Sequence, residues 1–179
     1  MSSFLEKARY LGVFIITGRK FKLSLSEPIC KFYKSVNGIL SKCAGSMNEI
    51  VLLNLFNAYC KPFIMYACES VALTKSEYAR LSNAWNSIFW KLFKVNDPNC
   101  INDILRFTGN LPVLMDIDVR RFSFLSKLVY TDNSVLQSLH NMFAKTEMER
   151  IAKVYNLPKD CSAGKFKNAV HDCHYFDTV

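Results

Sequence analysis

Apolar residues recur with a helical period over most of the chain, and with a strand period only near its start. A spacing of three and four residues places side chains on one face of an α-helix, and it first occurs after residue 25. The apolar positions there are Ile29, Phe32, Tyr33, Val36, Ile39, Leu40 and Cys43. The pattern predicts a helix that opens at Ser26-Glu27-Pro28, where proline is tolerated in the first turn, and ends at Gly45.

Start and stop signals divide the rest of the chain into further helices. Ser46 with Glu49, and Thr74 with Glu77, have the spacing of a capping box, which predicts a helix start at both places. Pro62 predicts a break, because proline cannot continue a helix without strain. Helices are expected at residues 46–61, 63–73, 74–95, 101–107, from about 112, at 134–143 and at 145–155. The tail from Pro158 shows no helical stripe.

A β-hairpin is expected before the first helix. Residues 10–16 are rich in Tyr, Val, Phe and Ile, and they are expected to pair with residues 20–25 through a turn near Gly18. Two strands alone are marginal in water, so the hairpin is expected to pack on the helices. The predicted fold class is mainly α: a short N-terminal β-hairpin followed by a bundle of about six to eight helices.

Charge points to a polyanionic partner. The chain has 23 lysines and arginines against 15 aspartates and glutamates, a net charge of +8, and the surplus lies in the first 131 residues. Such a surplus supplies most non-specific affinity for nucleic acid, although a generic basic protein would show it too. The seven cysteines lie mostly in apolar helical patterns, which favours a reducing, intracellular compartment, nuclear or cytoplasmic. No apolar run approaches the length of a membrane span.

Two predicted helix faces concentrate basic residues. Lys31, Lys34 and Lys42 share a face of the first helix. Gly38 lies on that face, at a cost of about 1 kcal/mol against alanine, which a closely approaching phosphate would explain. The stripe on the fourth predicted helix consists of Arg80, Asn83, Ser87, Lys91 and Lys94, and Arg120, Phe124 and Lys127 repeat the pattern more weakly. Trp90 beside the stripe is a candidate for stacking on a base. The alternatives are a solvated lysine face and a second packing face.

An ordered series of short motifs is similar to a known family. The series is Tyr10-Leu11-Gly12-Val13, Asn37, Tyr59-Cys60-Lys61-Pro62, Tyr66, Ala84-Trp85-Asn86, Ile88-Phe89-Trp90-Lys91, Phe107-Thr108-Gly109, Leu111-Pro112, Arg120-Arg121-Phe122, Phe124-Leu125 and Lys127-Leu128. In this order the motifs resemble the C-terminal part of the reverse transcriptase (RNA-directed DNA polymerase) of non-LTR, LINE-type retrotransposons, a class of transposable element. The resemblance covers roughly residues 9–131 and begins just after the catalytic aspartates of that family.

The resemblance implies a polymerase fragment without its catalytic palm. Tyr10, Leu11, Gly12 and Val13 would correspond to the primer grip, within a hairpin over residues 1–25. Residues 26–131 would form the thumb, which closes on a primer–template duplex of RNA and DNA, and residues 132–179 would be C-terminal helices and an irregular tail. The expected duplex contacts are Lys31, Lys34, Lys42, Arg80, Lys91, Lys94, Arg120 and Lys127. Removing the charges of Arg80, Lys91 and Lys94 is expected to weaken duplex binding.

No catalytic residue, metal site or cofactor is expected in this chain. No aspartate precedes Tyr10, so the carboxylate pair that holds two metal ions in the family is missing. Asp116 and Asp118 are no substitute, because residues spaced i,i+2 on a helix do not face one another. The chain is therefore expected to have no polymerase activity alone. Cys161, His171, Cys173 and His174 are ligand types for zinc, but they lack the close cysteine pair of a zinc knuckle.

A second reading belongs to another class of protein. A helical relic or a repurposed helical protein would bind another protein, a separate palm or a second copy of itself through an apolar surface left uncovered. Because the resemblance implies a thumb without its palm, Phe14, Ile15 and Ile16 of the hairpin are candidates for that exposed apolar patch. Salt distinguishes the two readings, because duplex binding weakens steeply with salt whereas apolar association does not.

Overall fold

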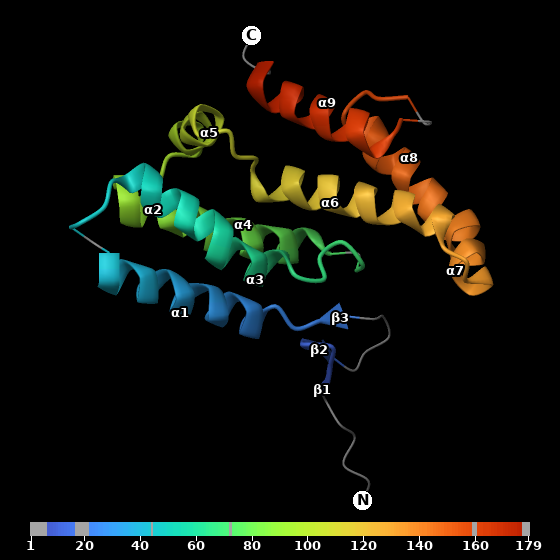
Figure 1. Cartoon of the computed structure of the whole chain (residues 1–179), viewed down its shortest axis with the longest axis horizontal. Helices are drawn as coiled ribbons and strands as arrows, with labels where there is room; N and C mark the ends of the chain where they lie inside the picture. The colour runs from blue at the N-terminus through green and yellow to red at the C-terminus, as the bar shows by residue number, and fades with distance from the viewer. Residues whose placement is uncertain (1–6, 17–21, 44, 72, 159–160, 177–179) are drawn as a thin grey trace, which may run out of the picture. The chain divides into compact units, whose positions relative to one another are not determined.

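A small β-sheet followed by helices makes up the chain, according to a computed structural model that describes residues 7–16, 22–43, 45–71, 73–158 and 161–176. Three short strands come first and all later elements in these ranges are helical (Figure 1). The described ranges hold seven continuous helices when π and 3₁₀ turns are joined to the α-helices that they extend. The expected mainly α fold, with an N-terminal hairpin and six to eight helices, is confirmed.

The chain divides into two compact units: unit 1 is Met1–Asn96 and unit 2 is Asp97–Val179. The boundary between them falls inside residues 26–131, the stretch that the sequence assigned to one thumb-like domain. Each unit has its own buried residues, and the two are described separately below.

Unit 1 opens with a three-stranded antiparallel sheet in the order β1-β2-β3. The strands are β1 (Lys7–Tyr10), β2 (Val13–Ile16) and β3 (Lys22–Leu23). β1 pairs with β2 over its whole length, and β2 pairs with β3 through Ile15 and Ile16. The predicted pairing of this strand with residues 20–25 is thus confirmed at residues 22–23, while the turn near Gly18 lies outside the described residues.

The expected continuous strand through Tyr10–Val13 is wrong, because the chain reverses there. Leu11 has φ 44° and Gly12 has φ 82°, which are the two consecutive left-handed residues of a type I′ hairpin turn. Glycine takes this conformation without steric cost. The Tyr66 hydroxyl donates a hydrogen bond to the Leu11 carbonyl at 2.8 Å, so a residue distant in sequence holds the turn in place.

The predicted apolar patch on the hairpin is largely covered. Ile16 is 37% exposed, but Phe14 and Ile15 are half-buried. The Arg9 guanidinium lies 5.9 Å from the centre of the Phe14 ring, within the range of a cation–π contact. The predicted patch is therefore reduced to one residue at the end of β2.

Helices complete unit 1, and local caps decide where two of them begin. Asn48, not Ser46, caps the second helix: its side-chain oxygen accepts from the Ile50 N–H at 2.8 Å. The capping box predicted at Ser46 is wrong, because the Ser46 hydroxyl donates back to the Cys43 carbonyl instead. The capping box of Thr74 and Glu77 is confirmed. The helices are α1 (Ser26–Cys43), α2 (Glu49–Leu55), the π turn η1 (Phe56–Cys60), α3 (Lys61–Met65) and α4 (Lys75–Phe93).

A π turn explains why the helix does not break at Pro62 as predicted. The Lys61 N–H donates to the carbonyl of Phe56, five residues back, so the helix is already widened where the proline ring enters. A widened turn accommodates both the ring and its missing donor. α2, η1 and α3 therefore form one continuous helix, and it ends at Met65 rather than at Leu73.

The core of unit 1 is centred on Trp85 of α4, which is fully buried. Its ring lies 6.3 Å from that of Phe32 on α1 and 6.2 Å from that of Phe89, centre to centre. The Lys61 ammonium lies 4.9 Å from the Trp85 ring, although Lys61 itself is almost fully buried. A buried ammonium is costly unless it is compensated, and the tryptophan face provides part of that compensation.

Unit 2 consists of helices arranged around a separate aromatic core. Phe122 and Phe166 stack with ring centres 4.1 Å apart and planes 5° from parallel, and Tyr155 meets Phe166 edge-on. Asp97 caps the first helix of the unit through the Cys100 N–H, so this helix starts three residues earlier than predicted. The elements are α5 (Pro98–Phe107), α6 (Val113–Lys127), the 3₁₀ turn η2 (Leu128–Tyr130), α7 (Ser134–Leu139), the π turn η3 (His140–Ala144), α8 (Lys145–Val154) and α9 (Ala163–Phe176).

The tail beyond Pro158 contains a helix that the sequence pattern did not predict. α9 packs on α6 and buries Phe166, Val170 and His174. These three positions are four residues apart and do form a helical stripe. The stripe was missed because one of its three members is a histidine, which counts as polar in a hydropathy pattern.

Burial of His174 makes the stability of unit 2 depend on pH. Its Nε2 has no hydrogen-bond partner among the described residues. Burial lowers the pKa of His174, the charges of Arg106 and His171 lower that pKa further, and a hydrogen bond with the Asn110 backbone opposes them. The unfolded chain therefore binds a proton at His174 more readily than the folded chain does.

Unit 2 is accordingly expected to lose stability as the pH falls. The loss begins near the ordinary pKa of histidine, about 6.5, and continues until the pH is below the lowered pKa of His174 in the folded unit. Denaturant unfolding followed by far-ultraviolet circular dichroism, at pH values on both sides of this range, measures the effect. A His174→Asn variant, which cannot titrate, is expected to lose less stability over the same interval. An equal loss in both proteins would show that His174 is not responsible.

Candidate nucleic-acid interface

The three lysines predicted on the first helix all lie on the solvent face of α1. Lys31, Lys34 and Lys42 are exposed, whereas Phe32 and Val36 on the opposite side are fully buried. Gly38 is exposed too, and a Cβ added to it would meet no atom within 4 Å. Among the described residues no packing accounts for this glycine, so as far as they extend the space above it is open to a ligand.

α4 lies beside α1, and two polar contacts fix how the helices are aligned. Arg80 donates to the Ser26 hydroxyl at 3.3 Å, and Lys91 donates to the Asn37 side-chain oxygen at 2.7 Å. The two contacts are separated by 11 residues, about three turns, on α1 and by the same number on α4. α1 and α4 are therefore parallel and in register (Figure 1). This seam places two cations of α4 along the edge of the α1 lysine face.

The end of α4 carries the other predicted contacts of that helix. Lys94 takes a left-handed conformation as the C-cap, and its ammonium lies 5.8 Å from the ring of Trp90. Trp90 is half exposed, unlike Trp85 one and a half turns before it. The sequence stripe is thus divided: Arg80 and Lys91 are engaged with α1, while Lys94 and Trp90 pair with each other near the solvent.

The primer-grip-like turn forms one wall of a pocket in unit 1. Gly12 of the turn and Tyr66, whose hydroxyl donates to the Leu11 carbonyl, both line it, while Tyr10 and Leu11 are exposed beside it. The pocket has a volume of about 320 Å³. Its lining residues are Gly12, Glu27, Pro28, Lys31, Pro62, Phe63 and Tyr66. Lys31 therefore joins the lysine face of α1 to an aromatic hollow beside the hairpin turn.

Arg120 and Lys127 lie on α6, in unit 2. The Arg120 guanidinium pairs with Asp116 on the same helix at 3.3 Å, so its charge is partly balanced. Lys127 is exposed in the last turn, with Phe124 one turn before it on the surface. These residues make a weaker basic surface than α1 does.

The net charge of the chain belongs entirely to unit 1. Residues 1–96 hold 13 lysines and arginines against 5 aspartates and glutamates, a difference of +8. Residues 97–179 hold 10 of each sign, a difference of zero. Long-range attraction of a polyanion therefore comes from unit 1.

The two carboxylates singled out in the sequence, Asp116 and Asp118, make contacts within unit 2. Asp118 accepts a hydrogen bond from the Tyr155 hydroxyl at 2.9 Å, and burial raises the pKa of this carboxyl above its usual range. Cys161 and His174 are buried in unit 2. In the described part of the chain no group of three or more histidines, cysteines or carboxylates is placed to hold a metal ion, and no helix there is long and apolar enough to cross a membrane.

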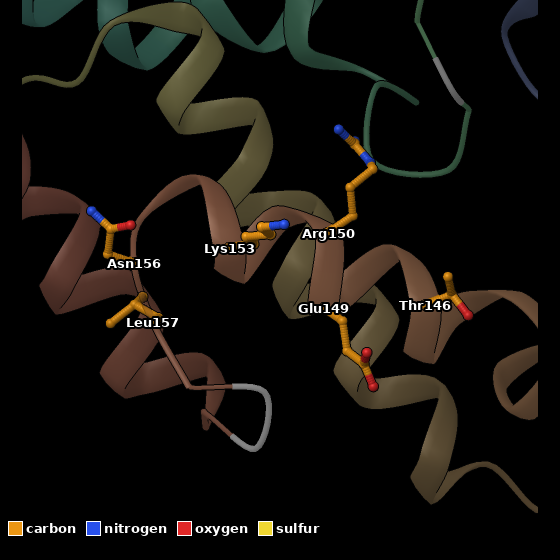
Figure 2. A pocket seen from close by; sticks show the side chains of 6 residues that line it. All are labelled: Thr146, Glu149, Arg150, Lys153, Asn156 and Leu157. Atoms are coloured by element: carbon orange, nitrogen blue, oxygen red, sulfur yellow. The ribbon is translucent and has the colours of Figure 1, made fainter.

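A second pocket lies along α8 in unit 2, with a volume of about 510 Å³. Thr146, Glu149, Arg150 and Lys153 line it from that helix, and Asn156 and Leu157 follow (Figure 2). Glu149 and Arg150 point to opposite sides in this view. Arg150 is also held by Glu147 through two hydrogen bonds of 2.8 Å. The side chains do not converge on one point, and the pocket offers no chemistry comparable to the α1 face.

The pairing of α1 with α4 was not inferred from the sequence. The matched interval of 11 residues between Ser26 and Asn37 and between Arg80 and Lys91 was a usable signal, but it needs the assumption that these two helices run parallel. The support of the hairpin turn by Tyr66 was also missed, since no local pattern links residues 55 positions apart.

Comparison of the chain with protein-family models, with curated proteins and with solved structures finds no match in any of the three.

Proposed function

We propose that unit 1 binds the sugar–phosphate backbone of a nucleic-acid duplex across α1 and the neighbouring edge of α4. The observation that carries the proposal is the exposed face of Lys31, Lys34 and Lys42, in a unit that holds the whole net charge of +8. The seam with α4 adds Arg80 and Lys91 along one edge. Contacts of this kind position a protein on nucleic acid without reading its sequence.

The motif resemblance specifies the duplex further. A thumb of the LINE-type reverse transcriptase family would hold a primer–template duplex of RNA and DNA, and the hairpin turn would lie near the primer. The proposal is therefore a fragment of an RNA-directed DNA polymerase that binds duplex and carries no catalytic step of its own. An uncovered apolar surface that binds another protein remains the competing function.

The test removes the three lysine charges of α1. The variant Lys31→Gln, Lys34→Gln, Lys42→Gln is expected to bind duplex at least about tenfold more weakly at low salt. The slope of log affinity against log salt is expected to flatten by about 3, because each phosphate contact contributes about 0.9. Fluorescence anisotropy with a labelled RNA–DNA duplex measures both quantities. The lysines of α1 are replaced in preference to Arg80 or Lys91. Loss of either of those two would also break a hydrogen bond between α1 and α4.

A matched control removes three exposed lysines of unit 2: Lys145→Gln, Lys165→Gln, Lys167→Gln. This variant has the same net charge as the α1 variant and is expected to bind nearly as the unmodified chain does. Equal weakening in both variants would refute a defined surface and leave only general charge attraction. Absence of duplex binding by the unmodified chain even at low salt would favour the protein-binding function.

A further inference from the structure

Unit 2 carries an exposed apolar surface at the turn into α7 and along α7–η3. Its members are Val129, Tyr130, Val135, Met142 and Phe143, whose exposed fractions run from 48% to 86%; they are called the apolar patch below. Exposed apolar residues scattered singly need no explanation, but a group of five within 15 residues does.

The members of the apolar patch come from elements that contact one another. η2 packs against α7, and η3 continues α7 without interruption. Val135 and Met142 both lie on the continuous α7–η3 helix, seven residues apart. Phe143 is adjacent to Met142, and Tyr130 projects from η2.

We propose that the apolar patch is the contact surface between two copies of this chain. A two-fold dimer needs only one kind of surface, because the same patch is presented by both copies. Met142 adapts its shape to an irregular partner surface.

Charge selects a second copy over a nucleic acid as the occupant. Asp132 is the one charged residue between Leu128 and Ala144, with His140 counted as neutral. The stretch itself offers a polyanion no cation, and the nearest ones in sequence are Lys127 and Lys145 at its two ends. Two copies of a protein with a net charge of +8 repel one another over most approaches. This repulsion is weaker when the copies meet through unit 2, whose own net charge is zero.

The size of the apolar patch fits a weak dimer. A whole aromatic side chain buries about 150–250 Å², and on that scale the exposed fractions leave roughly 600 Å² on each copy. A pair would bury about 1,200 Å², which is the lower end of specific interfaces. The dimer is therefore expected to form at micromolar rather than nanomolar concentrations.

Sedimentation velocity over a range of micromolar concentrations, on protein freed of nucleic acid by nuclease, tests the proposal. The unmodified chain is expected to shift from monomer to dimer as concentration rises, at low and at high salt alike. The variant Met142→Lys, Phe143→Lys is expected to weaken the dimer at least about tenfold, as loss of central contacts does. Circular dichroism checks that the variant is folded, which is expected because both side chains are exposed.

The matched control is Phe107→Lys, Phe176→Lys, which adds the same charge at two exposed residues of unit 2 outside the apolar patch. It is expected to dimerise as the unmodified chain does. A monomer at every concentration would overturn the proposal, and so would equal loss of dimer in both variants. Loss of the dimer in Phe14→Lys, Ile16→Lys, with none in Met142→Lys, Phe143→Lys, would assign self-association to the hairpin instead.

Discussion

Replacing Trp85 with alanine is expected to lower the free energy of unfolding of unit 1 by about 3–5 kcal/mol, the usual cost of truncating a buried aromatic residue. Trp85 is fully buried, and its ring touches those of Phe32 on α1 and Phe89 on α4. The change also takes the aromatic face away from the buried ammonium of Lys61, so the cation–π part of its stabilisation is lost.

Denaturant unfolding, followed by the fluorescence of the remaining tryptophan, Trp90, measures the change in the free energy of unfolding. Trp90→Ala is the matched control, because it removes the same side chain from the same helix where it is half exposed. A surface substitution of this kind is expected to change the free energy of unfolding by no more than about 0.5 kcal/mol. The fluorescence of Trp85 reports the unfolding of this variant. If the two variants were equally destabilised, the burial of Trp85 at the centre of unit 1 would be wrong.

Local signals in the sequence were enough for some elements and not for others. The capping box of Thr74 and Glu77 and the apolar spacing of α1 depend on residues within one turn, and both were predicted correctly. The helix through Pro62 was not, because a π turn just before the proline removes the strain that the rule assumes. The reversal at Leu11-Gly12 was also missed, since the hydroxyl that holds it belongs to Tyr66, far along the chain.

The candidate interface was predictable to the extent that it lies on one helix. Helical spacing alone placed Lys31, Lys34 and Lys42 on one face, and the structure leaves all three exposed. The stripe on α4 required knowledge of its neighbour. Arg80 and Lys91 lie at the edge toward α1 and donate to Ser26 and Asn37, a pairing that no single-helix pattern contains.

The separation of charge between the units gives each a different physical character. Unit 1 has the basic excess that draws a polyanion, and unit 2 has equal numbers of each sign with an apolar patch near η3. A duplex-binding unit joined to a self-associating unit would present two basic surfaces in one dimer. Two linked contacts raise apparent affinity for a long duplex well above that of either one, provided that both can engage together. Salt sensitivity would then belong to unit 1 and concentration dependence to unit 2.

Phe166→Ala is expected to have the largest effect on unit 2, a loss of about 3–5 kcal/mol, which is comparable with the whole stability of a small unit. Phe166 is fully buried and stacks on Phe122, so its loss detaches α9 from α6. Both tryptophans of the chain lie in unit 1. Circular dichroism should therefore show early unfolding of a part of the helices, while tryptophan fluorescence changes at nearly the same denaturant concentration as before.

Phe176→Ala is the control, since it removes the same side chain from the same helix where 77% of it is exposed, and it should leave both transitions in place. Equal effects of Phe166→Ala and Phe176→Ala would contradict the packing of α9, a helix that the sequence pattern failed to predict.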